Sequence, residues 1–268
     1  MKLEKFFRQQ PVFTNQGFAK FLAAAGSHNV RTQESLLNYH IKTGRILRVR
    51  RGLYAVMPVG ANPETYPVDP FLLAAKMTDD AVLAYHTALE FHGKAYSVYE
   101  YFYYLTGHSP RPVTFRSSNF RSVLFPKTLR VKNQQSFGVS EADRAGLGVR
   151  VTGLERTLVD VLDRPDLAGS WEEIWRSLES IEFFDLDKVI EYVLLLDNAT
   201  TAAKVGFFLE QHREALMVED VHLKAFQKLR PRQPHYFDRI RRKDGRLVKQ
   251  WNLVVPLSVI KRSWAEVI

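Results

Sequence analysis

The segment TNQGFAKFLAAAGSHNVRTQESLLNYHIKTGRILRVRRGLYAV occupies residues 14–56 and decides the fold of the N-terminal region. Apolar residues recur at helical spacing over residues 15–25 and again over residues 33–43. Two short runs with strand character follow at residues 46–49 and 53–56. Two helices joined by a tight turn and followed by a basic hairpin are typical of a winged helix-turn-helix, so we predict that fold here.

Polar residues and glycines mark the ends of these helices. We expect Thr14 to cap the first helix and Thr32 to cap the second, because a threonine hydroxyl can accept a hydrogen bond from a backbone N–H of the first turn. Gly26 and Gly44 follow the two helices as stop signals. A further short helix is expected upstream, where Pro11 ends it.

The positive charge of the 268-residue chain is concentrated at its two ends, and the formal net charge is +9. Residues 1–60 carry ten Lys or Arg against two Glu, and residues 228–268 carry eleven basic against three acidic side chains. Residues 61–227 are acidic overall, with 17 basic and 24 acidic side chains. Because clustered Lys and Arg displace counterions from a polyanion, the basic ends predict nucleic acid as the partner.

The composition excludes several classes of protein. An apolar fraction of 46% and a charged fraction of 25% are typical of a globular protein rather than a disordered one. The absence of cysteine excludes disulfides, thiol nucleophiles and cysteine zinc sites, and it favours the cytoplasm. The aliphatic stretch at residues 253–260 is too short to span a bilayer, and the N-terminus lacks the apolar run of a signal peptide. We therefore expect a cytoplasmic protein without a membrane partner.

A proline-rich segment separates the N-terminal region from the rest of the chain. Residues 57–70 contain four prolines, and the sign of the charge changes there. We expect a winged helix-turn-helix DNA-binding domain at residues 1–58, a linker at residues 59–70 and a mixed α/β domain at residues 71–268. Together these parts would make an α+β protein.

The second domain is expected to mix helices and strands. Helices are expected over residues 70–77, 81–91, 152–162, 170–181, 186–196, 200–216 and 219–229. Strands are expected over residues 96–106, 112–115 and 122–125. Thr152 and Ser170 begin capping-box sequences, and Asp244-Gly245 is a hairpin signal.

The helix over residues 33–43 and the hairpin after it supply side chains suited to DNA. Asn and Gln can make paired hydrogen bonds to adenine in the major groove, and a helix start favours a phosphate. We expect Arg48 and Arg50 to share the outward face of the hairpin, where they would contact a phosphate strand or the minor groove. The candidate DNA-binding residues are Arg31, Thr32, Gln33, Ser35, Asn38, Lys42, Arg45, Arg48, Arg50 and Arg51. The basic residues Arg239, Arg241, Arg242, Lys243 and Arg246 either form a second nucleic-acid surface or solubilise an edge hairpin.

A family resemblance is carried by four blocks in the same order along the chain. Residues 43–55, TGRILRVRRGLYA, resemble the wing signature of the AbiEi antitoxin family, which consists of bacterial transcriptional regulators from type IV toxin–antitoxin systems. Residues 69–93 and 249–256 are similar to two further blocks of that family. Residues 151–165 contain ERTLVD, the most distinctive of the four.

The resemblance implies a transcriptional autorepressor that binds inverted repeats in its own promoter. It also implies an antitoxin that counteracts a nucleotidyltransferase-like toxin from a neighbouring gene, without the need for a stable complex. Such pairs are associated with abortive infection and phage defence. A single winged helix gains affinity by occupying two half-sites, so we expect a monomer or weak dimer that cooperates on DNA.

No catalytic residue, metal site or cofactor is expected. His86 and His92 are six residues apart, whereas two metal ligands on one helix face are four apart. Arg156 and Asp160 are four residues apart and are expected to pair on a helix. Asp79-Asp80 is an acidic pair whose adjacent side chains would point apart on a helix. We therefore expect no enzymatic activity.

Two other functions and one further motif stay open at this stage. The chain could be a metal-dependent nuclease that the winged helix directs to DNA, or a transcription factor that responds to a small ligand. The tyrosine-rich run at residues 95–105 could stack nucleobases, although a half-buried strand is the commoner use of such a run.

Overall fold

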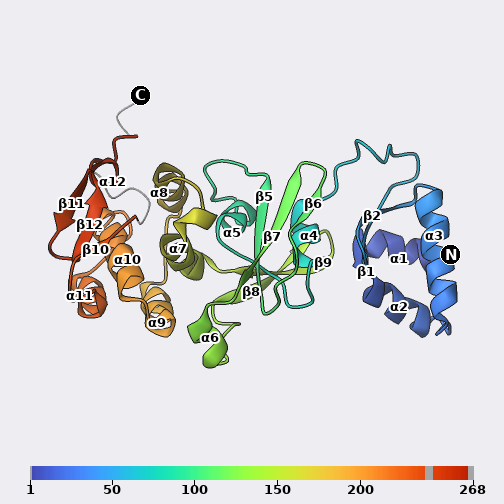
Figure 1. Ribbon diagram of the computed structural model, residues 1–268, viewed down its shortest axis with the longest axis horizontal. Coiled ribbons are helices and arrows are strands. Elements are labelled where there is room, and N and C mark those ends of the chain that lie inside the picture. The colour runs from blue at the N-terminus through green and yellow to red at the C-terminus, as the bar shows by residue number, and fades with distance from the viewer. Residues whose placement is uncertain (1, 239–243, 265–268) are drawn as a thin grey trace. The chain divides into compact units, whose positions relative to one another are not determined.

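The computed structural model describes residues 2–238 and 244–264 and combines helices with three sheets, so the predicted α+β class is confirmed (Figure 1). The chain forms two compact units. The first contains residues 1–83, 100–123 and 141–150, and the second contains residues 84–99, 124–140 and 151–268. The predicted linker at residues 59–70 lies within the first unit.

Residues 2–56, here called the N-terminal module, contain three helices and a three-stranded antiparallel sheet in the order β1-β3-β2. The elements are α1 (Lys2–Gln9), β1 (Val12–Thr14), α2 (Asn15–Ala24), α3 (Val30–Lys42), β2 (Ile46–Arg50) and β3 (Leu53–Val56). The hydroxyl of Thr14 accepts a 3.1 Å hydrogen bond from the backbone N–H of Gly17, which confirms Thr14 as the cap of α2. Strand β1 was not predicted, because three residues between a proline and a cap carry no periodic signal.

An aromatic core holds the N-terminal module together. Phe6 of α1 stacks on Phe21 of α2 with 4.5 Å between ring centroids and packs edge-on against Phe13 of β1 at 5.3 Å. Phe18 and Leu37 are buried in the same cluster. Residues of α1, β1 and α2 thus form the support on which α3 rests.

A six-stranded sheet follows in the order β6-β7-β5-β4-β9-β8. Its strands are β4 (Val82–Leu83), β5 (Tyr101–Thr106), β6 (Val113–Phe115), β7 (Ser118–Leu124), β8 (Val139–Arg144) and β9 (Leu147–Thr152). Helix α4 (Pro70–Ala75) is capped by Asp69, and its Phe71 ring meets Phe102 of β5 edge-on at 5.5 Å. Helix α4 therefore covers the face of β5 on which Phe102 lies.

The predicted helix over residues 81–91 is wrong in its first half. Residues 82–83 form β4, and only His86–Phe91 form a helix, α5. Tyr85 lies between them with φ 58° and ψ −135°, a backbone conformation that no helix contains. The run of apolar residues serves the middle of a sheet here, and an apolar run cannot by itself distinguish a buried strand from a buried helix.

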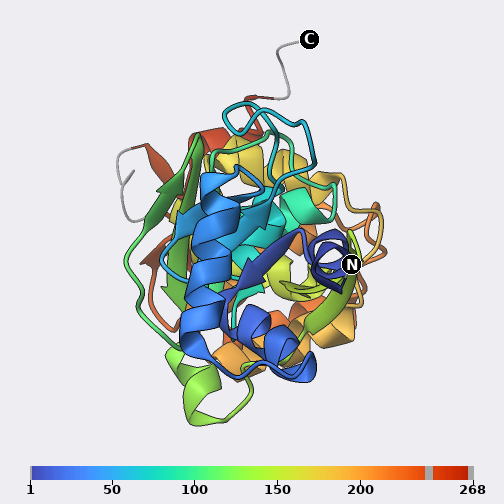
Figure 2. The ribbon, with the colours of Figure 1, turned by 90° about the vertical axis from the view of Figure 1, so that its right-hand side faces the viewer.

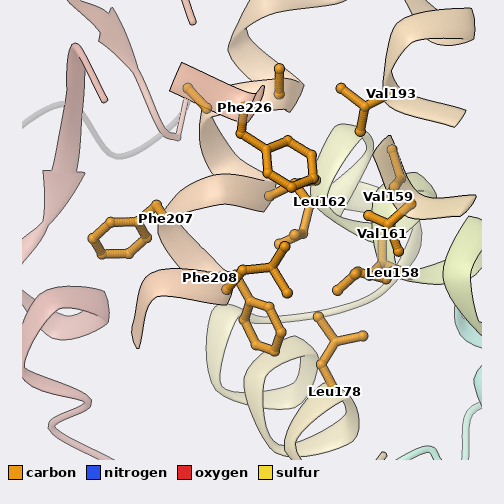
Figure 3. Close-up of a cluster of buried hydrophobic side chains, with 14 of the residues drawn as sticks. Leu158, Val159, Val161, Leu162, Leu178, Val193, Phe207, Phe208 and Phe226 are labelled. Carbon is orange, nitrogen blue, oxygen red and sulfur yellow. The ribbon is translucent and has the colours of Figure 1, made fainter. Parts of the chain in front are cut away.

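The second unit is mainly helical. Its further elements are α6 (Lys127–Val131), α7 (Leu154–Asp163), a 3₁₀ turn (Pro165–Leu167), α8 (Trp171–Glu179), α9 (Leu186–Leu196), α10 (Ala199–Gln211), α11 (Asp220–Leu229) and α12 (Leu257–Lys261). Helices α7, α8, α9, α10 and α11 contribute Leu158, Leu178, Val193, Phe208 and Phe226 to one apolar core (Figure 3). The prediction for residues 186–196 is confirmed at both ends.

One of the two predicted capping boxes is wrong and the other holds in part. Gly153 precedes α7, and the hydroxyl of Thr152 lies 2.8 Å from that of Thr157 instead of capping the helix. Ser170 does cap α8 by accepting a hydrogen bond from the backbone N–H of Glu173. The Glu173 carboxylate accepts hydrogen bonds from Ser97 rather than from its own helix start.

The last sheet contains β10 (His235–Tyr236), β12 (Leu253–Pro256) and β11 (Gly245–Val248) in that order. Strands β11 and β12 form an antiparallel hairpin whose turn is at residues 249–252, where Asn252 has φ 50°. The hairpin predicted at Asp244-Gly245 is wrong, because β10 and β11 on either side of it are not neighbours in the sheet, although Asp244 itself lies in a turn with φ 64°. No helix within the described ranges is long and apolar enough to cross a membrane.

Candidate nucleic-acid interface

Helix α3 is fixed at both ends by its local sequence. The side chain of Asn29 accepts a 2.8 Å hydrogen bond from the backbone N–H of Arg31 and so caps the helix. The helix ends at Lys42, and Gly44 follows with φ 68°, which glycine adopts without strain. Thr32 lies inside the first turn, so its predicted capping role is wrong. Asparagine ranks above threonine as a cap, and the helix accordingly begins three residues earlier than predicted.

A polar stripe runs along the exposed side of α3. Arg31, Ser35, Asn38 and Lys42 follow one another at intervals of four, three and four residues, which places them on one helix face, and all four are exposed. Leu37 is buried and holds the helix on the core. Figure 2 shows α3 along its whole length. These four residues, here called the α3 stripe, are accessible together to one extended partner.

Further residues of α3 border the stripe or support it, among them the exposed Glu34. Thr32 and Tyr39 are exposed beside it, and Tyr39, 61% exposed, was not among the predicted site residues. The sequence does contain a signal for Tyr39, because this large aromatic residue does not fall on the apolar face of the helix. Gln33 is half-buried, and its Nε2 donates a 3.0 Å hydrogen bond to the carbonyl of Asn15 at the start of α2. Gln33 therefore fixes α3 against α2 instead of joining the stripe.

The β2–β3 hairpin presents two of its arginines to solvent. Arg48 on β2 and Arg51 at the turn are exposed, and Gly52 completes the turn with φ 82°. The pairing of β2 with β3 shifts between Arg48 and Arg50, which breaks the simple alternation of the strand. Arg50 is half-buried and donates a hydrogen bond to the carbonyl of Met77. The expectation that Arg48 and Arg50 share one outward face is therefore wrong.

Arg45 is held within the fold. Its guanidinium pairs with the Glu4 carboxylate at 2.6 Å, donates a hydrogen bond to the carbonyl of Met57, and lies 5.5 Å from the ring centroid of Phe7. The hydrogen bond from Arg45 holds the pKa of Glu4 below its ordinary value. These contacts join α1 to both ends of the hairpin, so Arg45 positions the hairpin and does not extend the exposed basic surface.

Replacing Arg45 with alanine is expected to lower the free energy of unfolding by about 1–2 kcal/mol, because a charge-assisted hydrogen bond and a ring contact are lost. Replacing the exposed Arg48 with alanine should change stability by less than about 0.5 kcal/mol. Urea unfolding of the two variants beside the unaltered chain measures the difference. Equal stability of both variants would contradict the positioning role of Arg45.

The second predicted basic surface lies mostly outside the described residues. Arg239, Arg241, Arg242 and Lys243 fall in the undescribed segment, and Arg246 is exposed on β11. The structure therefore places one of these five residues on a solvent-facing strand and leaves the surface as a sequence-based prediction.

The polar residues weighed as catalytic or metal-binding candidates have structural partners. The imidazole of His86 is fully buried between two carboxylates, with Nδ1 3.0 Å from Glu90 and Nε2 3.2 Å from Glu173. The Nε2 of His92 lies 2.8 Å from the carbonyl of Thr152. Arg156 and Asp160 pair at 3.3 Å on α7, as their spacing predicted.

One group of potential metal ligands was not found from the sequence. Asp79, Asp80 and His108 bring one ligand atom each to within 4.8 Å of one another at the protein surface. The Asp80 carboxylate also accepts hydrogen bonds from the Thr106 hydroxyl and the backbone N–H of Gly107, and these hydrogen bonds help to keep its pKa below the ordinary value against the effect of burial. The sequence signal was too weak to find the group, because His108 is 28 residues from Asp80. An exposed acidic group of this kind does not by itself define a metal site.

Comparison with known proteins gives three findings. No curated protein matches the sequence at a significant level. The fold is similar to that of the crystal structure of the RV2827C protein from Mycobacterium tuberculosis, with a TM-score of 0.62 and 14% sequence identity over 99% of this chain and 94% of that chain. At that identity the likeness concerns the fold alone. Residues 1–56, which contain the α3 stripe and the β2–β3 hairpin, match the family model of the AbiEi antitoxin transcriptional regulators.

Proposed function

We propose that the chain is a DNA-binding transcriptional autorepressor and antitoxin of a type IV toxin–antitoxin system, acting in the cytoplasm. The observation that carries this proposal is the α3 stripe. Arg31, Ser35, Asn38 and Lys42 share the exposed side of a 13-residue helix, and the β2–β3 hairpin beside it exposes two arginines. The family match at residues 1–56 supports the same function.

The N-terminal module would bind DNA as a winged helix-turn-helix. An α-helix fits the major groove, and Asn38 has the amide that can pair with an adenine edge, while Ser35 can bond to several bases. Arg31 lies in the first turn of α3, where backbone N–H groups also favour a phosphate. Arg48 and Arg51 would contact the backbone or the minor groove from the hairpin. This arrangement separates base recognition on α3 from phosphate contact on the hairpin.

Replacing both Arg48 and Arg51 with alanine is expected to weaken binding to all duplexes by a similar factor. Each phosphate contact contributes about −0.9 to the slope of log K against log salt, so the slope should flatten by about 2. Fluorescence anisotropy with the promoter duplex and an unrelated duplex, each over a salt series, measures both effects. An unchanged slope would remove the hairpin from the contact surface.

The matched control is the Ser35→Ala, Asn38→Ala variant, which removes two uncharged side chains of the α3 stripe. We expect it to lose the preference for the promoter over the unrelated duplex while its salt slope stays unchanged, because these residues would contact bases and not phosphates. An equal loss of affinity for the two duplexes would show that other residues recognise the bases.

The α3 stripe carries neither the expected oligomeric state nor the antitoxin role, and each of these has its own argument. A single recognition helix covers a short site, so a monomer or weak dimer occupying two half-sites would gain affinity through linkage. Neutralisation of a nucleotidyltransferase-like toxin rests on the family match alone. Co-expression of the chain with the product of the neighbouring gene tests it, and rescue of growth without a stable complex would fit the proposal.

A pocket in the second unit favours one alternative, a regulator that responds to a small ligand. The pocket has a volume of about 660 Å³, a size suited to a small molecule, and is lined among others by Asp163, Arg164, Trp171, Lys204, Phe237 and Asp238. A compound that raises the melting temperature and changes promoter affinity, with both effects lost in the Trp171→Ala variant, would establish this function. A nuclease is the remaining alternative, and inertness toward single- and double-stranded DNA with Mg²⁺ or Mn²⁺ would exclude it.

A further inference from the structure

The tyrosine-rich run divides between the core and the surface. Tyr104 is fully buried, and its neighbour Leu105 is buried beside it. Tyr99 stacks on the imidazole of His86 with 3.9 Å between ring centroids. Tyr101 and Tyr103 alternate with buried Phe102 and Tyr104 along β5, so they lie on the opposite face of the strand from those two. The preferred interpretation as a half-buried strand therefore leaves two tyrosines unexplained.

Tyr101 and Tyr103 form a small aromatic surface with an arginine from the neighbouring strand. Their ring planes are within 16° of parallel, and the ring centroids are 6.4 Å apart. The guanidinium carbon of Arg121 on β7 lies 4.4 Å from the ring centroid of Tyr101. Tyr101 is 37% exposed, and Arg121 is exposed. We call these three residues the β5–β7 surface.

Polar residues lie beside this surface, and the unit that contains it has a net positive charge. Thr114 on β6 donates a 2.9 Å hydrogen bond to Asn119 on β7, and Asn119 lies on the same face as Arg121 by strand alternation. Residues 100–123 contain three arginines and one acidic residue, Glu100. The first unit as a whole carries 16 Lys or Arg against nine Asp or Glu. The net positive charge of this unit favours an anionic partner.

We propose that the β5–β7 surface binds single-stranded nucleic acid by stacking unpaired bases on Tyr101, Tyr103 and Arg121. Tyr103 is half-buried beside the exposed Tyr101. Tyrosine rings and arginine guanidinium planes stack bases without regard to sequence, and the charge of Arg121 attracts a phosphate. A duplex hides the faces of its bases within its own stack, so this surface would not bind the promoter duplex that we propose for the α3 stripe. The second site is thus distinct from the first in both ligand and position on the chain.

The test uses the full chain and fluorescein-labelled twelve-residue oligothymidylate and oligouridylate, followed by anisotropy. The Tyr101→Ala, Tyr103→Ala variant is expected to bind both oligonucleotides at least about tenfold more weakly, since loss of one stacking partner has an effect of this size. The matched control is Tyr96→Ala, which removes a tyrosine that is 57% exposed and carries the Arg176 guanidinium over its ring, but lies outside this surface. It should bind like the unaltered chain.

Three further variants keep the proposal testable if the alanine variant folds poorly. Tyr101→Phe, Tyr103→Phe keeps both rings and should retain binding. Glu100→Gln removes the single acidic residue of residues 100–123 and should strengthen binding, while Arg121→Gln should weaken it. Binding within twofold of the unaltered chain in both the double-alanine and Arg121→Gln variants would overturn the proposal, and so would no binding of either oligonucleotide by the unaltered chain.

The same variants separate this proposal from the DNA-binding function. Replacement of Tyr101 and Tyr103 should leave the affinity for the promoter duplex unchanged. Replacement of Arg48 and Arg51 should lower the affinity for that duplex, while the oligonucleotides still bind. If the Arg48, Arg51 variant no longer binds either ligand and the tyrosine variant still binds both, a single surface binds both ligands and the proposal is wrong. A preference for uridylate over thymidylate would identify RNA as the partner, and the reverse would identify DNA.

Discussion

Replacing Arg156 with methionine is expected to lower the free energy of unfolding by about 3–5 kcal/mol at neutral pH, because it leaves a buried carboxylate without its charged partner. Arg156 and Asp160 are both buried and pair at 3.3 Å on α7. The Arg156 guanidinium also donates to the backbone carbonyls of Gln135 at 2.9 Å and Phe137 at 2.6 Å, which would lose their donor. The hydroxyl of Tyr192 at 2.6 Å would be the main remaining partner of Asp160.

The loss of stability caused by Arg156→Met should increase with pH, because Asp160 titrates in this range. Burial raises the pKa of Asp160 from 3.8 to about 6, although Arg156 and the Tyr192 hydroxyl both favour the charged form. A raised native pKa means that the native state holds the proton more tightly than the unfolded chain, so this contribution to stability is present at low pH and is lost as the pH rises through 6. Removal of Arg156 raises that pKa further. The difference between the variant and the unaltered chain should therefore grow between pH 5 and pH 8.

Urea unfolding at pH 5, 6, 7 and 8 measures this prediction. The matched control is Arg213→Met, which breaks an ion pair of 2.7 Å with Asp220 in which both side chains are exposed. Exposed ion pairs contribute about 0–1 kcal/mol to stability, so Arg213→Met should lower the free energy of unfolding only slightly at any of these pH values. A loss below 1 kcal/mol for Arg156→Met, or a loss that shrinks as the pH rises, would contradict the account of this pair.

Replacing Trp251 with alanine is expected to cost about 3–5 kcal/mol, because removal of a fully buried indole leaves a cavity. The indole lies directly over Gly206 of α10. A Cβ on Gly206 would be 2.3 Å from two carbons of the ring. The ring cannot simply turn away, since its Nε1 donates a 2.6 Å hydrogen bond to Glu210. Gly206 is therefore required in the middle of a helix, where glycine is otherwise unfavourable.

A double-mutant cycle tests this contact directly. Gly206→Ala should destabilise the unaltered chain by about 1–3 kcal/mol through overpacking. In the Trp251→Ala background the same change should be neutral or stabilising, because alanine fills part of the cavity and favours the helix by about 1 kcal/mol. Additive effects of the two substitutions would show that Gly206 and Trp251 do not share this contact.

The N-terminal module was predictable because its signals are local. The Thr14 cap, the helical period of α2 and α3 and the Arg50-Arg51-Gly52 turn each act within a few residues, and all three appear in the structure. What the local pattern could not give is the direction of individual arginines. Arg45 and Arg50 look equivalent to Arg48 in the sequence, yet Glu4 and the carbonyls of Met57 and Met77 draw them into the fold.

The central sheet was only partly predictable because several of its strands have weak or ambiguous local signals. Strands β8 and β9 are joined by the two-residue turn Ala145-Gly146, and this hairpin was missed because β8 lacks the regular apolar alternation of a strand. The segment at residues 81–91 has the composition of a helix, and only its place between β5 and β9 makes residues 82–83 a strand. The turn at residues 249–252 was missed because Asp244-Gly245 is the stronger local signal, and it lies before β11 and not between the two strands of the hairpin.

The most direct test of the proposed DNA-binding function is a footprint of the purified chain on the DNA upstream of its own gene, over a salt series. The account predicts protection of two inverted half-sites that persists at moderate salt, with half-site centres about one helical turn or a multiple of it apart. The Ser35→Ala, Asn38→Ala variant should no longer protect these half-sites specifically. Uniform protection that disappears as salt rises, with no difference between the unaltered chain and that variant, would contradict sequence recognition by the α3 stripe.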